Sequence, residues 1–450
     1  MNYLIIGLGK SGIGAIKLLL TKNENVFVYD DNKKVVNQMI NAKIFSQKVT
    51  FLQKINAKTL KFVDYVVISP GVSAQKYEKL ANKCGVKIIG EIELAYRFCD
   101  CPVLAVTGTN GKTTTVNLLF EMLKKVEPTT CLVGNVGNSF CETLAEKNVC
   151  PAVCEVSSFQ LETIDSFKPN MVGFLNIRDD HLDRYKTFDN YFRAKQNIFK
   201  NFSKFNIFVL NYDDKNLLEF SNSVDCEKYY FSLSKIPEEL FGAYVFEDEI
   251  KFKLHQETYA IKLKEIPLLG KHNLYNFMCA GLMALLYGVG FDVVRCAVKE
   301  FSLPEHRVEF VKKIDGVSFY DDSKGTNIHA TLCAILCFRE STLLMLGGQD
   351  KGENFDNLFG NLPKNVTRIF VFGKTRKKIL KSAKKSGYQN IYDFKSLSDA
   401  FKQINTKEME EKVVLLSPAC SSFDQFSSYE ERGNYFKSLV EGCLSEKSIY

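Results

Sequence analysis

The chain has 450 residues, of which 46% are hydrophobic and 25% charged, and its formal net charge is +7. This composition predicts a soluble globular protein with room for two or three hydrophobic cores. It argues against a membrane protein, because no apolar run approaches the ~18 residues that would cross a bilayer. Glycines and a lysine interrupt the apolar start, so no secretory signal is expected and the predicted location is the cytoplasm.

The charges and cysteines further restrict the kinds of protein that the sequence is compatible with. Lysines cluster only locally and there is no long basic tail, so an anionic small substrate explains the positive excess at least as well as nucleic acid does. The fourteen cysteines are scattered without the paired spacing of a zinc site. We therefore expect reduced thiols and no binding to nucleic acid or to a membrane. A monomer is a separate expectation, which the charges and cysteines do not decide.

A glycine-rich loop at residues 7–12, Gly-Leu-Gly-Lys-Ser-Gly, follows a predicted strand at residues 3–6. Asp30 closes the next predicted strand, at residues 26–29. By itself this pattern is a dinucleotide-binding fingerprint, with Asp30 near the place of a ribose-binding acid. A nicotinamide-dependent oxidoreductase is therefore one candidate.

Short apolar runs followed by longer helix-like stretches recur along the whole chain, which is typical of parallel α/β units. In such sheets ligands bind at the carboxyl ends of the strands. We predict three domains, 1–98, 99–302 and 303–450. Residues 242–261 alternate apolar and charged side chains and predict a β-hairpin inserted in the central domain.

Residues 107–114, Thr-Gly-Thr-Asn-Gly-Lys-Thr-Thr, lie between a predicted strand at 103–106 and a predicted helix at 115–125. They predict a phosphate-binding loop, in which backbone N–H groups close on phosphates, Lys112 neutralises β/γ oxygens and the Thr113 hydroxyl binds magnesium. The spacing Gly-x-x-Gly-Lys-Thr is shorter than the common Walker pattern. The alternative is a structural glycine turn ahead of a helix.

Glu155 and His181 follow the next predicted strands, at residues 152–154 and 171–177. A carboxylate and an imidazole beside a nucleotide triphosphate suit Mg²⁺ ligands, because the phosphate charge must be neutralised. The competing interpretation is that His181 caps a helix and that Glu155 pairs with a surface lysine.

Three further loops, at residues 321–327, 347–351 and 417–426, follow predicted strands of the last domain. They are rich in hydroxyls, amides and lysines, which suits a small ligand with more than one carboxylate. Each loop taken singly is also compatible with ordinary turn chemistry, and Arg307 with a surface arginine.

Taken in order, these loops resemble those of the Mur ligases, and the resemblance covers essentially the whole chain. It implies an α/β fold with a Rossmann-like N-terminal domain, a central P-loop ATPase-like domain and a Rossmann-like C-terminal domain. It also implies ATP-dependent amide-bond formation with Mg²⁺ in the synthesis of peptidoglycan precursors. The loop at residues 417–426, followed by Tyr429, Glu430, Arg432 and Gly433, is similar to that of the members that add D-glutamate to UDP-N-acetylmuramoyl-L-alanine.

The resemblance also implies residue roles. Catalytic roles are implied for Lys112, Glu155, His181 and Lys195. ATP contacts are implied for Gly108, Thr109, Asn110, Gly111, Lys112, Thr113, Thr114, Asn273, Asn276 and Arg307. Contacts to the uridine-diphosphate sugar are implied for Lys10, Ser11, Asp30, Ser69, Gly71, Asn135 and Gln160, and contacts to D-glutamate for Thr326, Lys351, Ser422, Phe423 and Tyr429. Thr113, Glu155, His181 and Lys195 would bind two Mg²⁺, with Lys195 carbamylated because an ammonium group cannot bind a cation.

Two functions besides the oxidoreductase compete with a Mur ligase. A folylpolyglutamate synthase-type ligase shares the ATP chemistry, but the complete N-terminal domain over residues 7–71 argues against it. A non-catalytic, nucleotide-regulated binding protein would use the same loops without turnover. The oxidoreductase leaves the Lys-Thr-Thr of residues 112–114 without a role.

Overall fold

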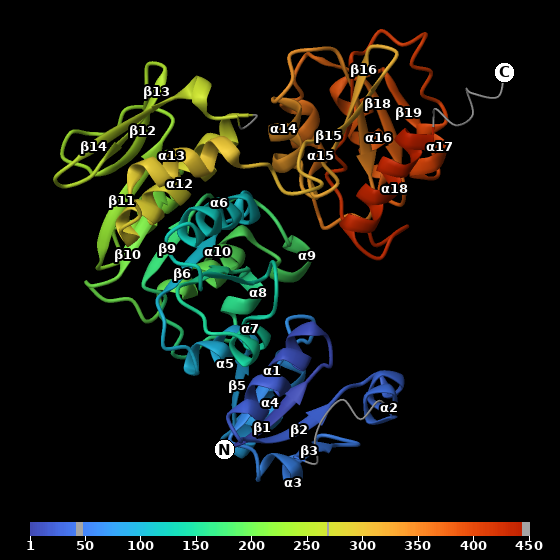
Figure 1. The fold of residues 1–450 in the computed structure, drawn as a ribbon. Coiled ribbons are helices and arrows are strands. Elements are labelled where there is room, and N and C mark those ends of the chain that lie inside the picture. The colour runs from blue at the N-terminus through green and yellow to red at the C-terminus, as the bar shows by residue number, and fades with distance from the viewer. Residues whose placement is uncertain (42–47, 268–269, 443–450) are drawn as a thin grey trace. The chain divides into compact units, whose positions relative to one another are not determined.

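The computed structural model describes residues 1–41, 48–267 and 270–442. These residues form three β-sheets with helices between the strands (Figure 1), which confirms the predicted α/β class. Contacts between residues divide the chain into two compact units. Unit 1 comprises Met1–Ile177, Phe192–Glu265 and Asn276–Lys299, and unit 2 comprises Arg178–Tyr191, Ile266–Tyr275 and the chain from Glu300 onward.

The first sheet of unit 1 has five parallel strands in the order β3-β2-β1-β4-β5. The strands are β1 (Asn2–Ile6), β2 (Asn25–Tyr29), β3 (Val49–Phe51), β4 (Tyr65–Ile68) and β5 (Lys87–Gly90). The helices are α1 (Lys10–Thr21), α2 (Lys33–Asn41), α3 (Ala57–Leu60), α4 (Gln75–Cys84) and α5 (Glu91–Arg97). The strand order reverses between β1 and β4, and such a reversal is where open α/β sheets bind their ligands.

The second sheet of unit 1 has nine strands in the order β14-β13-β12-β11-β10-β9-β6-β8-β7. They are β6 (Val103–Thr107), β7 (Cys131–Gly134), β8 (Ala152–Glu155), β9 (Met171–Phe174), β10 (Ile207–Asn211), β11 (Glu227–Ser232), β12 (Gly242–Phe246), β13 (Glu249–Lys253) and β14 (Thr258–Lys262). The segments after β6 hold α6 (Lys112–Lys124), α7 (Phe140–Glu146), α8 (Ser158–Leu161), α9 (Leu182–Tyr185), α10 (Phe188–Gln196), η1 (Asn197–Phe199), α11 (Lys215–Ser221), η2 (Leu263–Glu265), α12 (Lys271–Tyr287) and α13 (Phe291–Glu300). Strand β6, which leads into the predicted phosphate loop, lies between β8 and β9.

The predicted hairpin at residues 242–261 is present and larger than expected. Strands β12, β13 and β14 form an antiparallel meander, and β12 pairs in parallel with β11, so the meander extends the nine-stranded sheet. Ile250, Phe252 and Ile261 are buried on one face, which accounts for the alternating pattern in the sequence.

Helix α5 fastens the first sheet to the second through two buried carboxylates. Glu93 accepts hydrogen bonds from the backbone N–H groups of Asp165, Ser166 and Phe167. Glu91 accepts from the Ser139 hydroxyl at 2.6 Å. Because a buried carboxylate needs several donors, these bonds fix α5 against the central sheet.

The sheet of unit 2 has six strands in the order β15-β16-β20-β17-β18-β19, and only the pair β15 and β16 is antiparallel. The strands are β15 (Glu309–Ile314), β16 (Val317–Asp321), β17 (Thr342–Gly347), β18 (Val366–Phe372), β19 (Ile391–Asp393) and β20 (Val413–Leu416). The helices that follow β16 are α14 (Ile328–Ile335), α15 (Phe355–Gly360), α16 (Arg376–Ser386), α17 (Leu397–Phe401) and α18 (Tyr429–Gly442).

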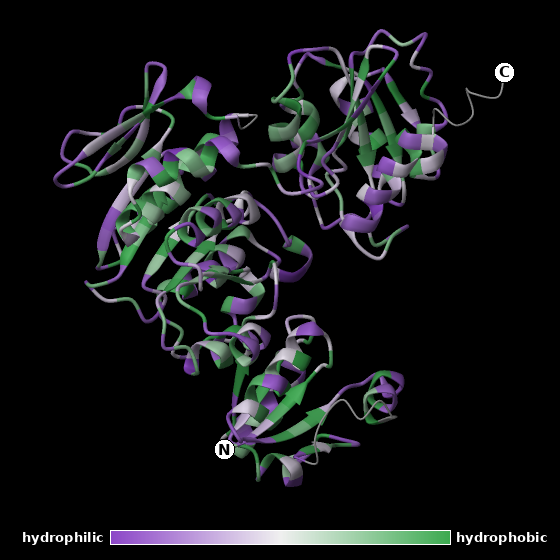
Figure 2. Ribbon diagram, in the orientation of Figure 1, coloured by the Kyte–Doolittle hydropathy of each residue, from purple (hydrophilic) through white to green (hydrophobic). Residues whose placement is uncertain are grey.

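Both faces of this sheet are covered by apolar side chains. Leu344 and Leu346 belong to one buried cluster, whereas Leu343 and Met345, which alternate with them along β17, belong to another. The inner strands β17 and β20 are accordingly mostly hydrophobic in Figure 2, as in sheets with helices on both sides. Within the described part of the chain, no helix is both long enough and apolar enough to cross a membrane.

Candidate functional site

The first glycine loop lies at the reversal point of the first sheet. Its backbone is held by neighbouring strand ends, because the Asp30 carboxylate accepts from Leu8 N–H at 2.7 Å and the Ser69 hydroxyl donates to the Gly7 carbonyl at 2.9 Å. A Cβ at Gly12 would collide with that same carbonyl, so residue 12 has to be glycine for α1 to start so close to β1. Asp30 and Ser69 thus shape the loop from the ends of β2 and β4.

The other residues predicted to contact the sugar nucleotide lie in this loop, after β4 and in the segments that follow β7 and β8. Lys10 donates to the Gly137 carbonyl at 2.7 Å, which brings the loop against the turn that carries Asn135. Gly71 is exposed two residues after Ser69, and Ser11 is half-buried in the first turn of α1. The side chain of Gln160 is already hydrogen-bonded within the protein, because it forms a capping box with Ser157 at the start of α8.

The predicted phosphate loop follows β6 and ends at helix α6, as expected. Gly108 and Gly111 have φ of +145° and +91°, a region that favours glycine. Lys112 donates to the carbonyls of Gly108 and Thr109, at 2.8 Å each, so its ammonium group folds over the loop. Backbone N–H groups at the start of a helix, beside a lysine, form an anion-binding site.

Asn176 shapes this loop and was not predicted from the sequence. Its carbonyl oxygens accept from the N–H groups of Thr109 and Asn110, at 3.0 and 2.9 Å, and its amide donates to the Asn110 carbonyl at 3.0 Å. A single asparagine shortly after strand β9 gives no sequence signal, because asparagines are common in such turns.

Glu155 lies beside the phosphate loop and is buried, at 2% exposure. Its carboxylate accepts from the Thr113 hydroxyl at 2.8 Å and from the Asn135 amide at 2.9 Å. The structure therefore brings Thr113, Glu155 and Asn135 together. A hydroxyl and a carboxylate held at a phosphate loop are hard oxygen donors of the kind that Mg²⁺ prefers, so these residues fit that ion.

Lys195 and Asn276 also reach this region. Lys195 is 1% exposed, and its ammonium nitrogen lies 3.4 Å from the hydroxyl of Thr107, the first residue of the loop. Asn276 accepts from the Thr115 hydroxyl at 3.3 Å and lies against Gly111. Asn273, also buried, is three residues earlier in α12, on the same face of the helix.

His181 belongs to the segment Arg178–Tyr191, which groups with unit 2. It has a left-handed backbone, φ 54°, and stands at the N-cap of α9, so the competing prediction of a helix-capping position is partly met. No side-chain capping bond comes from it. Its imidazole lies 3.8 Å from the Asp180 carboxylate and packs edge-on against Tyr191.

Asp180 connects His181 to two of the residues predicted for D-glutamate. Lys351 lies 3.7 Å from the Asp180 carboxylate and donates to the Thr326 hydroxyl at 3.2 Å. Burial, followed by the charge of Asp180, raises the pKa of the neighbouring Glu353 to about 7. Lys351, Thr326 and two acids thus form one polar cluster in unit 2.

The three predicted C-terminal loops meet at one edge of the third sheet, because β16, β20 and β17 are parallel neighbours. Asp322 is buried there and accepts from the Ser417 hydroxyl at 2.7 Å. Burial raises its pKa to about 7, against the opposing effect of the half-buried Arg307. The sequence placed Asp322 in a ligand-binding loop without marking it as a site residue.

Arg432 ties two of these loops together and is fully buried. It donates to the hydroxyl and carbonyl of Ser323, at 2.9 and 2.8 Å, and to the carbonyls of Cys420 and Ser421. Ser323 in turn donates to the Tyr429 carbonyl at 2.9 Å. This network holds Tyr429.

The remaining residues predicted for D-glutamate differ in exposure. Ser422 is 2% exposed, whereas the Phe423 side chain is 66% exposed. The ammonium group of Lys324 lies 4.8 Å from the centre of the Tyr429 ring. Phe423 therefore offers aromatic surface on this loop, and Tyr429 lies at the start of α18.

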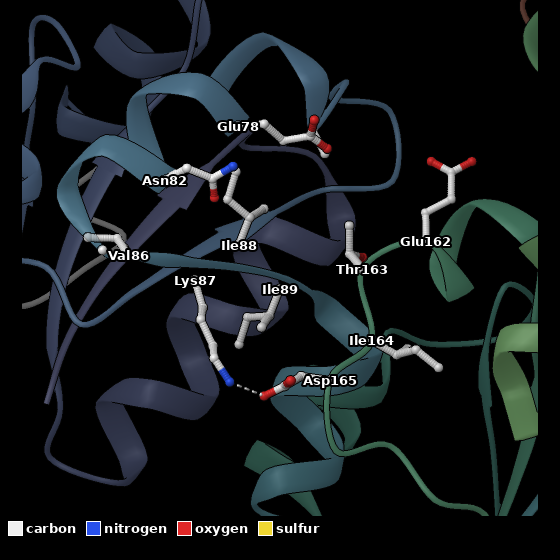
Figure 3. Close-up of a pocket in the computed structure, with 12 residues that line it drawn as sticks. Glu78, Asn82, Val86, Lys87, Ile88, Ile89, Glu162, Thr163, Ile164 and Asp165 are labelled. Atoms are coloured by element: carbon white, nitrogen blue, oxygen red, sulfur yellow. Dashed lines mark hydrogen bonds and ion pairs between the residues drawn. The ribbon is translucent and has the colours of Figure 1, made fainter. Parts of the chain in front are cut away.

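A pocket of about 540 Å³ lies elsewhere in unit 1, between α4, β5 and residues 162–165 (Figure 3). It is lined by Glu78, Asn82 and Ile88 among others, and Lys87 and Asp165 pair across it at 2.9 Å. None of the predicted site residues lines it.

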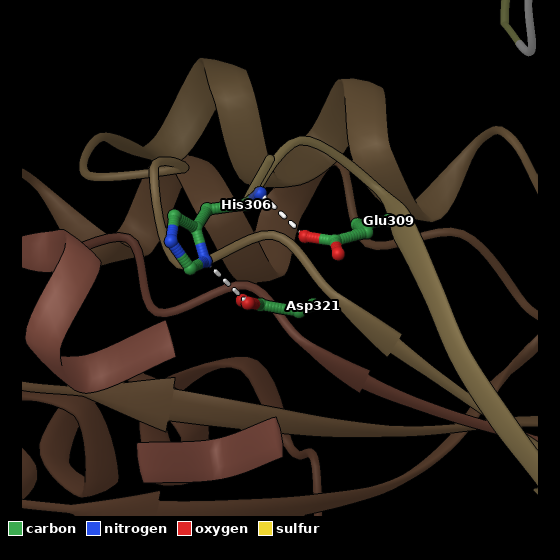
Figure 4. Close-up of side chains that lie close together, drawn as sticks. All are labelled: His306, Glu309 and Asp321. Atoms are coloured by element: carbon green, nitrogen blue, oxygen red, sulfur yellow. Dashed lines mark hydrogen bonds and ion pairs between the residues drawn. The ribbon is translucent and has the colours of Figure 1, made fainter. Parts of the chain in front are cut away.

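His306, Glu309 and Asp321 lie close enough together to suggest a metal centre (Figure 4). Their polar atoms are engaged with the protein. His306 Nδ1 is 2.6 Å from the Asp321 carboxylate, and Lys437 contacts both Glu309 oxygens at 2.9 and 3.0 Å. Because an ammonium group occupies the side where a cation would bind Glu309, this cluster is a structural hydrogen-bond network.

Three family models match successive parts of the chain. They are the Mur ligase MurD-like N-terminal domain over residues 1–90, the Mur ligase middle domain over residues 106–284 and the Mur ligase glutamate ligase domain over residues 306–420. The chain is also similar to solved structures. Among them are UDP-N-acetylmuramate-alanine ligase MurC and MurF ligase in complex with ADP, both from Thermotoga maritima, with TM-scores of 0.61 and 0.60 at 19% and 16% identity. These alignments cover 98% of this chain and 100% and 95% of the solved chains, and show the same fold.

Curated relatives are similar at higher identity. UDP-N-acetylmuramoylalanine–D-glutamate ligase of Caldicellulosiruptor bescii is 38% identical, over 99% of this chain and 98% of the relative. The protein of the same name from Thermoanaerobacter pseudethanolicus is 39% identical, over 98% of each chain.

Proposed function

The chain belongs to the Mur ligase family, and from this premise we propose that it joins D-glutamate to UDP-N-acetylmuramoyl-L-alanine, with ATP converted to ADP and phosphate. The observation that carries this proposal is the full-length similarity to D-glutamate ligases at 38–39% identity. A folylpolyglutamate synthase-type ligase is not favoured, since the MurD-like N-terminal model matches residues 1–90. An oxidoreductase is disfavoured by the same match.

We assign one ligand to each predicted domain. Residues 1–98 hold the uridine-diphosphate sugar at the reversal point of the first sheet, with Lys10, Ser11 and Gly71 at the loop. Residues 99–302 hold ATP, and residues 303–450 hold D-glutamate. Asn135 and Gln160 extend the sugar site from the central domain.

The reaction we propose has two steps. The alanyl carboxylate attacks the γ-phosphorus of ATP and gives an acyl phosphate, and the amine of D-glutamate then attacks the acyl carbon and releases phosphate. Lys112 stabilises the charge on the transferred phosphoryl group, since it lies over the N-terminus of α6. Asn176 keeps the loop amides in place for the same phosphates.

Mg²⁺ would be held by Thr113 and Glu155, which already share a hydrogen bond. When bound, the ion neutralises phosphate charge and so favours attack by an anionic carboxylate. Lys195 would provide a further ligand if it were carbamylated, and its burial beside Thr107 supports this, because a buried ammonium group is costly to keep charged. His181 is proposed as the ligand of a second Mg²⁺.

D-Glutamate is recognised by the cluster in unit 2. Lys351 and Thr326 provide a cation and a hydroxyl for a side-chain carboxylate. Ser422 and Tyr429 complete the pocket from the last loop, with Phe423 as an exposed aromatic wall.

The decisive measurement is ATP-dependent phosphate release by the full chain with UDP-N-acetylmuramoyl-L-alanine and a panel of D- and L-amino acids. We expect release with D-glutamate. Release with another amino acid in preference to D-glutamate would overturn the assigned specificity. No release with any amino acid would favour a non-catalytic binding protein.

The carbamate has its own test. Lys195→Ala should lose turnover, bicarbonate should not restore it and short carboxylates should restore part of it, because they replace the lost oxygen ligands. Full turnover of Lys195→Ala in bicarbonate-free buffer contradicts the carbamate and leaves the ligase assignment intact.

A further inference from the structure

Two cysteine side chains lie in contact in the short segment between α5 and β6. The sulfur atoms of Cys99 and Cys101 are 3.2 Å apart, and both side chains are half-buried. A disulfide bond is about 2.05 Å long, so the two sulfurs would have to approach by roughly 1 Å more. A shift of that size is within the reach of side-chain rotation in an irregular segment.

Both ends of this segment are fixed. On one side, Glu91 and Glu93 fasten α5 to the central domain through buried hydrogen bonds. On the other side, β6 is paired on both edges, with β8 and β9. The two thiols are thus held together by the surrounding structure, which raises their effective concentration for one another.

The environment also makes Cys99 the more reactive of the two. The Cys101 thiol lies within hydrogen-bonding distance of the Cys99 sulfur and lowers the pKa of Cys99 to about 7, while the pKa of Cys101 is raised by the same contact. The thiolate is the nucleophilic form of cysteine. By contrast, burial raises the pKa of Cys141, Cys154 and Cys279.

We propose that Cys99 and Cys101 are a reversible redox pair that forms a disulfide when the protein meets hydrogen peroxide. The Cys99 thiolate attacks one peroxide oxygen, forming an S–O bond as the O–O bond breaks, and the other oxygen leaves as hydroxide, which takes up a proton. The Cys101 sulfur then attacks the Cys99 sulfur, the S–S bond forms, and the hydroxyl leaves with the Cys101 proton as water. Overall the two thiols lose two electrons and two protons, and the peroxide is reduced to two waters. A dithiol reverses the reaction by exchange.

The site is distinct from the proposed ligase chemistry. Cys101 stands two residues before β6 and the phosphate loop follows its other end, so at about 3.3 Å per residue the two lie on the order of 20 Å apart. The redox pair can therefore be tested independently of the ligase activity.

The test is peptide mass analysis of the full-length protein. Trypsin cuts after Arg97 and Lys112, which places Cys99 and Cys101 together in peptide 98–112 with no other cysteine. After treatment of the reduced protein with hydrogen peroxide and alkylation, we expect this peptide about 2 Da lighter than its dithiol form and without alkyl groups. Dithiothreitol should restore alkylation at both sulfurs.

Three variants make the result specific. Cys99→Ser should abolish the 2 Da loss, whereas the matched control Cys333→Ser, at a half-buried cysteine of α14, should leave it unchanged. Cys150→Ser removes an exposed thiol near Cys101, and should also leave the loss unchanged. The wild-type alkylation result does not depend on whether any variant folds.

Three results of the peroxide treatment would overturn the proposal. These are a peptide 98–112 that stays fully alkylated after peroxide, one that gains only about 16, 32 or 48 Da from oxygen atoms, or one that is joined to the peptide of Cys150.

Discussion

The buried carboxyl group of Asp322 predicts a pH dependence of the free energy of unfolding, and the magnitude of this dependence follows from the surroundings of the group. It lies at the end of β16, where it accepts from the Ser417 hydroxyl at 2.7 Å and from Val308 N–H at 3.3 Å. Burial is the largest influence and raises the pKa of this group from 3.8 to about 7. The folded state therefore holds a proton that the unfolded chain releases, and this favours folding at low pH.

The sign of the pH dependence follows from that difference. As pH rises from about 4 to about 7, the unfolded state loses the proton first, so the free energy of unfolding falls. Three pKa units at about 1.4 kcal/mol each give about 4 kcal/mol in total, of which about 2 to 3 kcal/mol is lost between pH 5 and pH 8. Asp322→Asn keeps the shape and has no proton to lose, so this loss should be absent from the variant.

The assay is denaturant or calorimetric unfolding of the full chain at pH 5 and pH 8, for wild type and Asp322→Asn. The stability of the variant relative to wild type should rise by about 2 to 3 kcal/mol from pH 5 to pH 8. Asp356→Asn is the control, because the exposed Asp356 is paired with Lys385 and its pKa is lowered. A relative stability of Asp322→Asn that is equal at both pH values, or that falls at pH 8, would show that Asp322 does not hold its proton in the folded protein.

Three further substitutions test the site and its supports. Lys112→Ala removes the ammonium group over the phosphate loop and should lower ATP-dependent phosphate release at least ~100-fold with little change in melting temperature; an unchanged rate contradicts the mechanism. Gly12→Ala should weaken binding of the uridine-diphosphate sugar at least ~10-fold in calorimetric titration, since its Cβ collides with the Gly7 carbonyl, and ATP binding serves as the internal control. Arg432→Lys should lower the free energy of unfolding by roughly 2 to 4 kcal/mol, because an ammonium group cannot replace the bonds to Ser323 and its neighbours; equal denaturation midpoints and slopes for wild type and variant would count against this role.

The sequence predicted the loops well because their chemistry depends on local spacing. Gly108, Gly111 and Lys112 stand between a strand and a helix, so their spacing alone locates that loop in the sequence. The three C-terminal loops were expected at strand ends and lie there. The hairpin at residues 242–261 was predicted from its alternation, but its third strand and its pairing with β11 depend on the rest of the sheet.

The α/β class, the order of the loops at the strand ends and the family resemblance that the comparisons confirmed could therefore be predicted from the sequence alone. Tertiary structure decided which side chains support those loops. Asn176, Asp180 and Arg432 act through hydrogen bonds to residues that are distant in sequence, as Arg432 does to Ser323. Such partners leave no local pattern, because a hydrogen bond across a fold depends on where the strands place the two groups and not on their spacing along the chain.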